Sequence, residues 1–176
     1  MFEELPLAEV YRLIEPGPVV LLTTADEGRA NVMAMSWHMM MEFTPPLVAC
    51  LVSGSYSFAA LRATGECVIA IPDVGLAPKV VAAGNCSGRT VDKFREIGLT
   101  PLPAAEVGAP LVAECFANLE CRVVDDGFVK RYNLFVLEVV RAWRDPAQAA
   151  PKTIHHTGYG HFVVDGETIA LPSKMP

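Results

Sequence analysis

Short apolar runs rich in β-branched residues recur along the chain and are separated by turn residues, a pattern typical of strands rather than of long helices. The run Pro18–Thr24 predicts the first strand. The turn Ala25–Gly28 then returns the chain into a second strand, so that the two form a hairpin. This second strand is predicted at 31–41, and further strands at 47–52, 67–71, 111–124 and 134–143, with a hairpin over 162–171 that turns at Asp165-Gly166.

Helical spacing is confined to a few short segments, at residues 7–14, 55–64, 78–83 and 91–97. Gly65 is placed to end the second of these helices, and Thr44-Pro45-Pro46 closes the far end of the first hairpin. Strands do not alternate regularly with helices, and neither a G-x-G-x-x-G motif nor a phosphate loop is present. The pattern therefore predicts a mainly β fold, a closed antiparallel barrel with short helical insertions, and disfavours a Rossmann sheet.

The composition favours one globular domain spanning residues 1–176. Apolar residues make up 52% of the chain and charged residues 19%, which is too apolar for disorder. No apolar run reaches the roughly 18 residues that a membrane-spanning helix needs, so we expect no membrane contact. Because a small domain has limited interior, part of this apolar surface is expected to lie in a homodimer interface or against a flat ligand.

Charge and cysteine content restrict the partners and the compartment. The net charge of -6 argues against nucleic-acid binding, which depends on clustered Lys and Arg. The acidic N-terminus has neither the basic start nor the apolar core of a secretory signal, so we expect a cytoplasmic protein. The five cysteines are odd in number and stand mostly within apolar strands, which indicates reduced core residues: Cys50, Cys67, Cys86, Cys115 and Cys121.

The segment 23–37 combines soft apolar side chains with polar groups. Its methionines, together with the run Met39–Met41, offer polarizable thioethers for the face of a flat ring, while Asn31, Ser36 and the backbone can form hydrogen bonds with a polar ring edge. The alternative is a buried hairpin strand in which Met fills space.

Two loops that enter helices could hold an anion. Ser53–Phe58 carries three hydroxyls at a helix start, which suits either a phosphate or ordinary N-capping. In Ser87–Phe94, Lys93 with Arg89 nearby could neutralise a phosphate, or could simply lie on a solvated helix face.

The histidines concentrate in one segment, His155–His161. Partners at the spacing of zinc sites are missing, so we expect no metal. The interspersed glycines favour a loop whose imidazole and aromatic groups cover a ligand.

Taken in this order, the segments resemble the flavin reductase-like family that includes the flavoredoxins, over roughly residues 16–171. The resemblance rests on G-R-A-N-V-M-A-M-S-W before the Pro-Pro turn, on the serine-rich turn and on S-G-R-T-V-D-K-F. It implies an FMN-binding split β-barrel with Greek-key-like antiparallel strands. The residues that match the family's FMN-binding positions are Asn31, Val32, Met33, Ala34, Met35, Ser36, Trp37, Ser53, Ser55, Ser57, Lys93 and Phe162.

The resemblance further implies a flavin reductase in which FMN, in a cleft at a homodimer interface, accepts a hydride from NADH or NADPH. Two other functions stay open: a flavoredoxin-like carrier that passes electrons to a redox partner protein, and a flavin-binding module without turnover. One departure is Tyr132, which stands where many members have a His. The candidates to replace that His are His155, His156 and His161.

Overall fold

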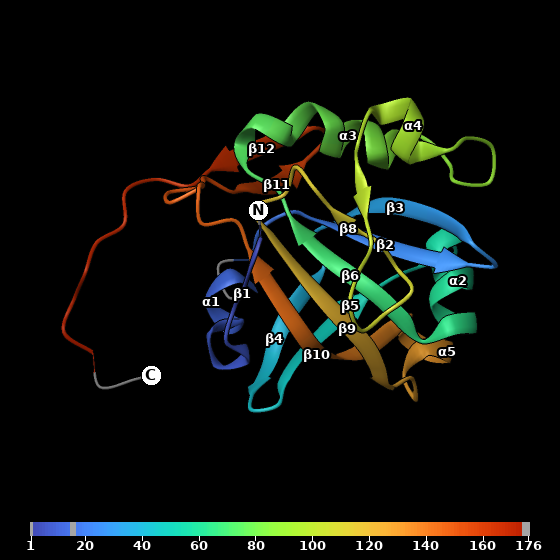
Figure 1. Cartoon of the computed structure of the whole chain (residues 1–176), viewed down its shortest axis with the longest axis horizontal. Helices are drawn as coiled ribbons and strands as arrows, with labels where there is room; N and C mark the ends of the chain where they lie inside the picture. The colour runs from blue at the N-terminus through green and yellow to red at the C-terminus, as the bar shows by residue number, and fades with distance from the viewer. Residues whose placement is uncertain (1, 15–16, 174–176) are drawn as a thin grey trace.

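The strand-forming runs assemble into one antiparallel sheet in the computed structural model, which describes residues 2–14 and 17–173. Its strands follow the order β3-β2-β6-β9-β10-β5-β4, and a short β1 pairs with β10 (Figure 1). Their bounds are β1 (Glu3–Glu4), β2 (Val20–Asp26), β3 (Arg29–Met35), β4 (His38–Phe43), β5 (Pro46–Leu51), β6 (Glu66–Ile71), β9 (Ala117–Asp125) and β10 (Leu134–Arg144).

The sheet closes on itself because its two end strands are neighbours in sequence. β3 and β4 lie at opposite ends of the strand order, yet only Ser36 and Trp37 join them. The three Cα–Cα steps from Met35 to His38 span at most about 11 Å, so the sheet must curl until these ends come close together. The backbone N–H of Leu51 donates to the Trp37 carbonyl at 3.0 Å and secures the join. The predicted mainly β barrel with short helical insertions is therefore confirmed.

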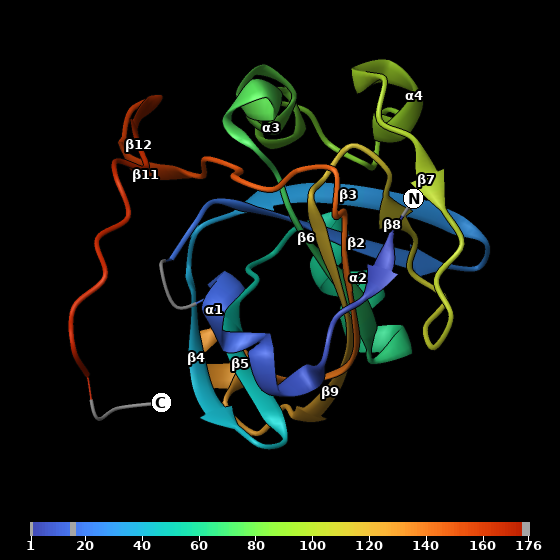
Figure 2. The same cartoon turned by 60° about the vertical axis from the view of Figure 1, so that its left-hand side comes forward.

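Short helices and two small hairpins surround the barrel. The helices are η1 (Leu7–Glu9), α1 (Tyr11–Ile14), α2 (Tyr56–Thr64), η2 (Val74–Leu76), α3 (Ala77–Asn85), α4 (Lys93–Ile97) and α5 (Val129–Tyr132), and the hairpins pair β7 (Pro101–Leu102) with β8 (Leu111–Val112) and β11 (Ile154–Gly158) with β12 (His161–Val164). Figure 2 shows α1 at the open end of the barrel, while α3 and α4 lie over β3. The longest helices of the described residues have nine residues, far short of the about 20 needed to cross a bilayer.

The sequence dictates the ends of α2 directly. The Ser55 hydroxyl caps its start by accepting a hydrogen bond from the backbone N–H of Phe58 at 3.2 Å. Gly65 ends the helix in the left-handed conformation, with φ of 68° and its N–H bonded to the Leu61 carbonyl, as predicted.

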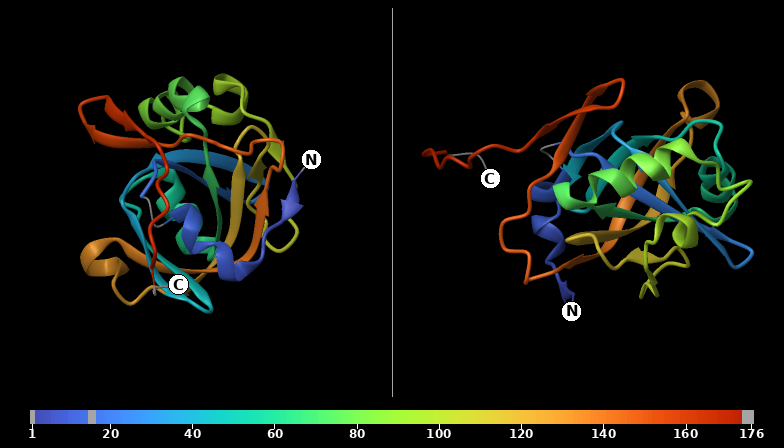
Figure 3. Two further views of the ribbon diagram at one scale, coloured as in Figure 1. Left: turned by 90° about the vertical axis from the view of Figure 1, so that its left-hand side faces the viewer. Right: turned by 90° about the horizontal axis from the view of Figure 1, so that it is seen from above.

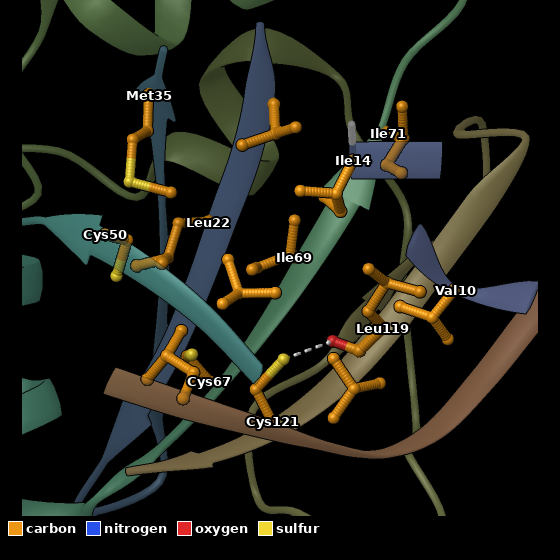
Figure 4. Close-up of a cluster of buried hydrophobic side chains, with 14 of the residues drawn as sticks. Val10, Ile14, Leu22, Met35, Cys50, Cys67, Ile69, Ile71, Leu119 and Cys121 are labelled. Atoms are coloured by element: carbon orange, nitrogen blue, oxygen red, sulfur yellow. Dashed lines mark hydrogen bonds between the residues drawn. The ribbon is translucent and has the colours of Figure 1, made fainter. Parts of the chain in front are cut away.

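Strand alternation divides the core into an inner and an outer layer. Val20 and Leu22 of β2 point into the barrel, where they join the cluster drawn in Figure 4. Leu21 points outward and packs beneath Val80 of α3 and Phe94 of α4. The barrel thus carries a second apolar layer on the side that holds α3 and α4.

Four of the five cysteines are buried in these layers, in agreement with the expectation of reduced core residues. Cys67 and Cys121 stand opposite each other on β6 and β9, and the Cys121 thiol bonds to the Leu119 carbonyl at 3.4 Å (Figure 4). The hydrogen bond between the Cys67 and Cys121 side chains, together with burial, raises the pKa of the Cys67 thiol. Only Cys86, at the end of α3, is partly exposed.

Two predicted strands are wrong in extent. The expected strand 31–41 is two strands, because the chain leaves β2 after Met35 and crosses to pair with β5 from His38 onward. The expected strand 111–124 is interrupted between β8 and β9. There the side-chain amide of Asn118 takes the place of a strand partner, accepting from the Val112 N–H at 2.8 Å and donating to its carbonyl at 3.2 Å.

The predicted C-terminal hairpin over 162–171 is also wrong. The real hairpin pairs β11 with β12 and turns at Tyr159-Gly160, where consecutive positive φ angles of 50° and 76° reverse the chain. Asp165-Gly166 does not form the turn, because the Asp165 side chain is bonded to Thr153 at the base of this hairpin. The histidine segment consequently forms strands rather than a loop, and Figure 3 shows the hairpin projecting beside α3.

Candidate functional site

The edge strand β3 organises the candidate site. Among the described strands it pairs with β2 alone, so its other backbone edge faces away from the sheet. α2 contacts it on one side and α3 on the other. Two cavities lie along this open edge, each of about 280 Å³. They meet at Ala34 of β3 and Gly84 of α3, which line both of them.

The first cavity, which we call the cationic cavity, brings together all three segments singled out in the sequence. Its lining residues are Asn31, Met33, Ala34, Gly54, Ser55, Tyr56, Ser57, Ala83, Gly84, Cys86, Ser87, Gly88, Arg89 and Lys93. None of them is Asp or Glu, although the protein carries a net charge of -6. Serine hydroxyls, the start of α2 and two basic side chains make this cavity suitable for an anion.

Asn31 ties the walls of the cationic cavity together. Its side chain is buried, and its Nδ2 donates to the Ser57 hydroxyl of α2 at 2.7 Å. On the other side it touches Gly88 so closely that an added Cβ there would lie 2.1 Å from the Asn31 Oδ1. Arg29 supports the same wall by donating to the Gly88 carbonyl and lying 4.9 Å from the centre of the Tyr56 ring.

Lys93 is held at the bottom of this cavity. Although it begins α4, only 5% of it is exposed, and its ammonium donates to the Ala83 carbonyl at the end of α3 at 2.6 Å. Burial lowers the pKa of Lys93, while nearby Cys86 acts in the opposite direction. The ammonium keeps further N–H groups that can reach an anion.

The second cavity, which we call the apolar cavity, lies between β3, α3 and the β11–β12 hairpin. Its lining residues are Val19, Ala34, Met35, Ser36, Val80, Val81, Gly84, Asn85, His156, Gly160 and Phe162. The rings of His156 and Phe162 are stacked with centres 5.1 Å apart and a tilt of 43°. An apolar slot with a few polar groups, beside the open backbone edge of β3, suits a flat heteroaromatic ring.

Small residues keep the two cavities in contact. A Cβ added to Gly84 would lie 3.8 Å from the Cβ of Ala34, so these two positions leave space where a larger pair would fill it. Together the cavities fit a ligand that has a flat ring at one end and a phosphate at the other. FMN has this form, and these residues fit it.

Most of the predicted FMN-binding residues line these cavities: Asn31, Met33, Ala34, Met35, Ser36, Ser55, Ser57, Lys93 and Phe162. Three lie elsewhere. Val32 is buried in the outer core layer, Ser53 is exposed next to the cationic cavity's loop, and Trp37 is 70% exposed after Ser36. The lining residues of α3 were not identified from the sequence. Val80, Val81 and Gly84 have no polar side chain that would mark them as ligand-binding residues.

The other sequence candidates are separate from both cavities. Met39–Met41 line a different cavity of about 470 Å³ near α1, together with His38 and Phe43. His38 bonds to the Pro18 carbonyl through Nε2 at 2.7 Å, and burial lowers its pKa. Tyr132 lies on α5 beside Phe128 and contacts neither cavity.

Comparison with known proteins identifies the family of the chain. Residues 11–162 match the family described as the flavin reductase like domain. The uncharacterized protein YddH of Escherichia coli (strain K12) is 34% identical over 96% of this chain and 97% of its own. A reductase component of a 4-nitrophenol 4-monooxygenase/4-nitrocatechol 2-monooxygenase from Rhodococcus opacus is 30% identical over 82% of this chain and 74% of its own.

Solved structures share the whole fold. An FMN-binding domain of a flavin reductases-like enzyme from Shewanella baltica OS155 superposes with a TM-score of 0.92, at 27% identity over 98% of both chains. Flavoredoxin of Desulfovibrio vulgaris (Miyazaki F) superposes with a TM-score of 0.80, at 25% identity over 90% of this chain and 91% of its own.

The contact between Gly88 and Asn31 can be tested with two matched substitutions. Gly88→Ala should destabilise the fold by about 1–3 kcal/mol, because the new methyl group overlaps the buried amide. Gly84→Ala adds the same methyl group to a helix at an ordinary contact distance, and should be neutral or stabilising by up to about 1 kcal/mol. Urea unfolding measures both, and equal effects would contradict the close packing around Asn31.

Proposed function

Because the chain belongs to the flavin reductase-like family, we propose that this FMN-binding oxidoreductase takes electrons from NADH or NADPH and acts as a flavin reductase. The observation that carries this proposal is the pair of cavities along β3, one apolar and one cationic without a carboxylate. We take residues 1–176 as a single flavin reductase-like domain.

The chemistry of the lining residues gives each end of FMN its place. The phosphate belongs in the cationic cavity, beside Lys93 and the hydroxyls of Ser55 and Ser57. The isoalloxazine ring belongs in the apolar cavity, where Met35 and Phe162 supply soft contacts. The open backbone edge of β3 supplies N–H and C=O groups for the polar edge of the ring.

The protein's own contribution is to position the flavin and to shield it from water. When FMN is bound, the chemistry it supplies is the acceptance of a hydride from a nicotinamide. The apolar wall of Val80, Val81 and Phe162 excludes water from that face, and N–H groups of β3 near the ring would favour the anionic reduced form. This transfer requires no acid or base from the protein.

One observation favours a second function, that of an electron carrier. The fold matches a flavoredoxin at 25% identity, and the same cavities would serve a flavin that exchanges electrons with a protein partner. A flavin-binding module without turnover would also use these cavities. The three functions differ in their reaction with nicotinamides.

Anaerobic mixing of the FMN-loaded protein with NADH and with NADPH distinguishes these functions. We expect at least one of the two to bleach the visible flavin absorbance within catalytic times. Chemical reduction by dithionite serves as the control for complete bleaching. A bound flavin that dithionite bleaches but neither nicotinamide does would exclude the reductase and favour the carrier or the module.

The role of Lys93 can be tested by comparing FMN with riboflavin, which lacks the phosphate. Lys93→Met keeps the buried stem but removes the charge, so FMN should bind about ten- to a hundredfold more weakly while riboflavin changes little. Lys79→Met removes a lysine of α3 that bonds to Gly98 outside the cavities, and should leave both affinities unchanged. Fluorescence titration gives the affinities, and equal loss for both flavins would contradict the assigned phosphate site.

A row of exposed apolar side chains supports the homodimer expected from composition. The residues in this row are Trp37, Met39, Met41 and Phe43, on and just before the end strand β4, and 44–70% of each is exposed. Such a patch on an end strand is typical of a protein interface. Because Met35 and Ser36 line the apolar cavity and Trp37 follows at once, the flavin would lie next to this interface.

Charge placed in the row should weaken the dimer. Met39→Glu buries a carboxylate in the interface, so sedimentation should show a shift from dimer toward monomer. Arg95→Gln changes the net charge by the same amount on the exposed part of α4, and should leave the dimer intact. A monomer for the unsubstituted protein at micromolar concentration would refute the homodimer.

The thiols support a location in the cytoplasm. All five cysteines are free, which agrees with a reducing compartment. Recovery of the protein from an exported fraction of the cells would contradict this.

A further inference from the structure

The β11–β12 hairpin forms one wall of the apolar cavity but is only weakly attached to the barrel. It is a separate two-stranded sheet that projects beside α3 (Figure 2). Isolated hairpins of two strands are marginally stable, so this wall needs an anchor to stay in place. Part of that anchor is at its base, where Ile154 is buried and its carbonyl accepts from the Val19 N–H at 2.8 Å.

The strand alternation separates two functions on this hairpin. His156 and Phe162 stand opposite each other in the register, and both line the apolar cavity. His155, next to His156, points to the other face of the strand and does not line the cavity. Its contacts are with the body of the protein and with the segment that follows the hairpin.

Both ring nitrogens of His155 face acceptors. Nδ1 lies 3.1 Å from the Gly17 carbonyl, and Nε2 lies 2.7 Å from the Asp165 Oδ1. A carbonyl and a carboxylate can only accept, so each of these two bonds needs a proton on the ring nitrogen that makes it. The Thr153 hydroxyl fits this arrangement, because it donates to Asp165 at 2.6 Å and lies 3.1 Å from Nε2.

Through these bonds His155 links three parts of the chain: the segment before β2, the strand β11 and the end of the hairpin after β12. We propose that His155 is a positioning residue that clamps the hairpin against Gly17 and so holds His156 and Phe162 against the flavin ring. This inference rests on the proposed function for the identity of the ligand, but the clamp itself is a property of the unliganded chain.

The charged surroundings of His155 support the clamp. Within the described chain, Asp165 is the charged group in hydrogen-bond contact with the ring. Although its burial acts in the opposite direction, the bonds from Thr153 and His155 lower the pKa of Asp165, which favours its ionised form as an acceptor. On the other side of the Gly17-Pro18 segment, the Nε2 of His38 lies 2.7 Å from the Pro18 carbonyl, and burial lowers the pKa of His38.

Loss of the bond from His155 to Gly17 or to Asp165 removes one of the attachments of the hairpin. The hairpin should then loosen, and bound FMN should leave faster.

The experiment measures the dissociation rate of FMN by fluorescence. His155→Asn keeps a donor near the position of Nδ1 but loses the bond to Asp165. It should release FMN about tenfold faster than the unsubstituted protein.

Two matched variants separate the clamp from general damage to the hairpin. His161→Asn alters an exposed imidazole of the same hairpin whose ring bonds to Gly158 in the turn, and should keep the rate. Thr153→Ser keeps the hydroxyl and should behave as the unsubstituted protein, whereas Thr153→Val should release FMN faster. An unchanged rate for His155→Asn would overturn the proposal.

Hydrogen exchange of the unliganded protein keeps this test independent of FMN. The amides of β11 and β12 should exchange faster in His155→Asn than in His161→Asn. If the protein binds no FMN but the exchange differs as expected, the proposed function fails while the clamp stands. If FMN binds and the exchange is equal in both variants, the clamp fails while the function stands.

Discussion

The buried side chain of Asn31 is the constraint on which the candidate site depends. It joins the edge strand β3 to α2 through Ser57, and its close contact with Gly88 brings the loop before α4 against the same strand. These three segments lie far apart in sequence. Their meeting at one amide places the hydroxyls of α2 and the ammonium of Lys93 in a single cavity, so the cationic cavity follows from packing around Asn31.

The incomplete closure of the barrel between β3 and β4 explains why β3 is free to take part in a site. In a fully closed barrel each strand has two partners and no backbone edge is left open. Here the chain crosses from β3 to β4 through two residues, and the crossing leaves the outer edge of β3 unpaired along Asn31–Met35. The same crossing places Trp37 and β4 on the outside, so one topological feature produces both the open edge beside the two cavities and the apolar row.

Local signals allowed the sequence to predict much of this arrangement. The caps of α2, the turn after β2 and the runs of β6 and β10 depend on neighbouring residues, and they were predicted correctly. The crossing at Ser36-Trp37 and the interruption at Asn118 depend on distant partners, so an apolar pattern cannot reveal them. For the same reason the residues of α3 in the site were missed, because Gly84 acquires its role only by facing Ala34.

In the C-terminal hairpin, predicting the turn at the wrong residues prevents the faces of the strand from being assigned from the sequence. Asp165-Gly166 has the composition of a turn, but its carboxylate is bonded to Thr153 and His155, and the turn forms instead where Tyr159 and Gly160 accept positive φ. With the turn moved, the neighbouring histidines fall on opposite faces of one strand. One imidazole faces the cavity and the other faces the barrel, so two adjacent residues of the same type have different roles, and only the register of the strand assigns them.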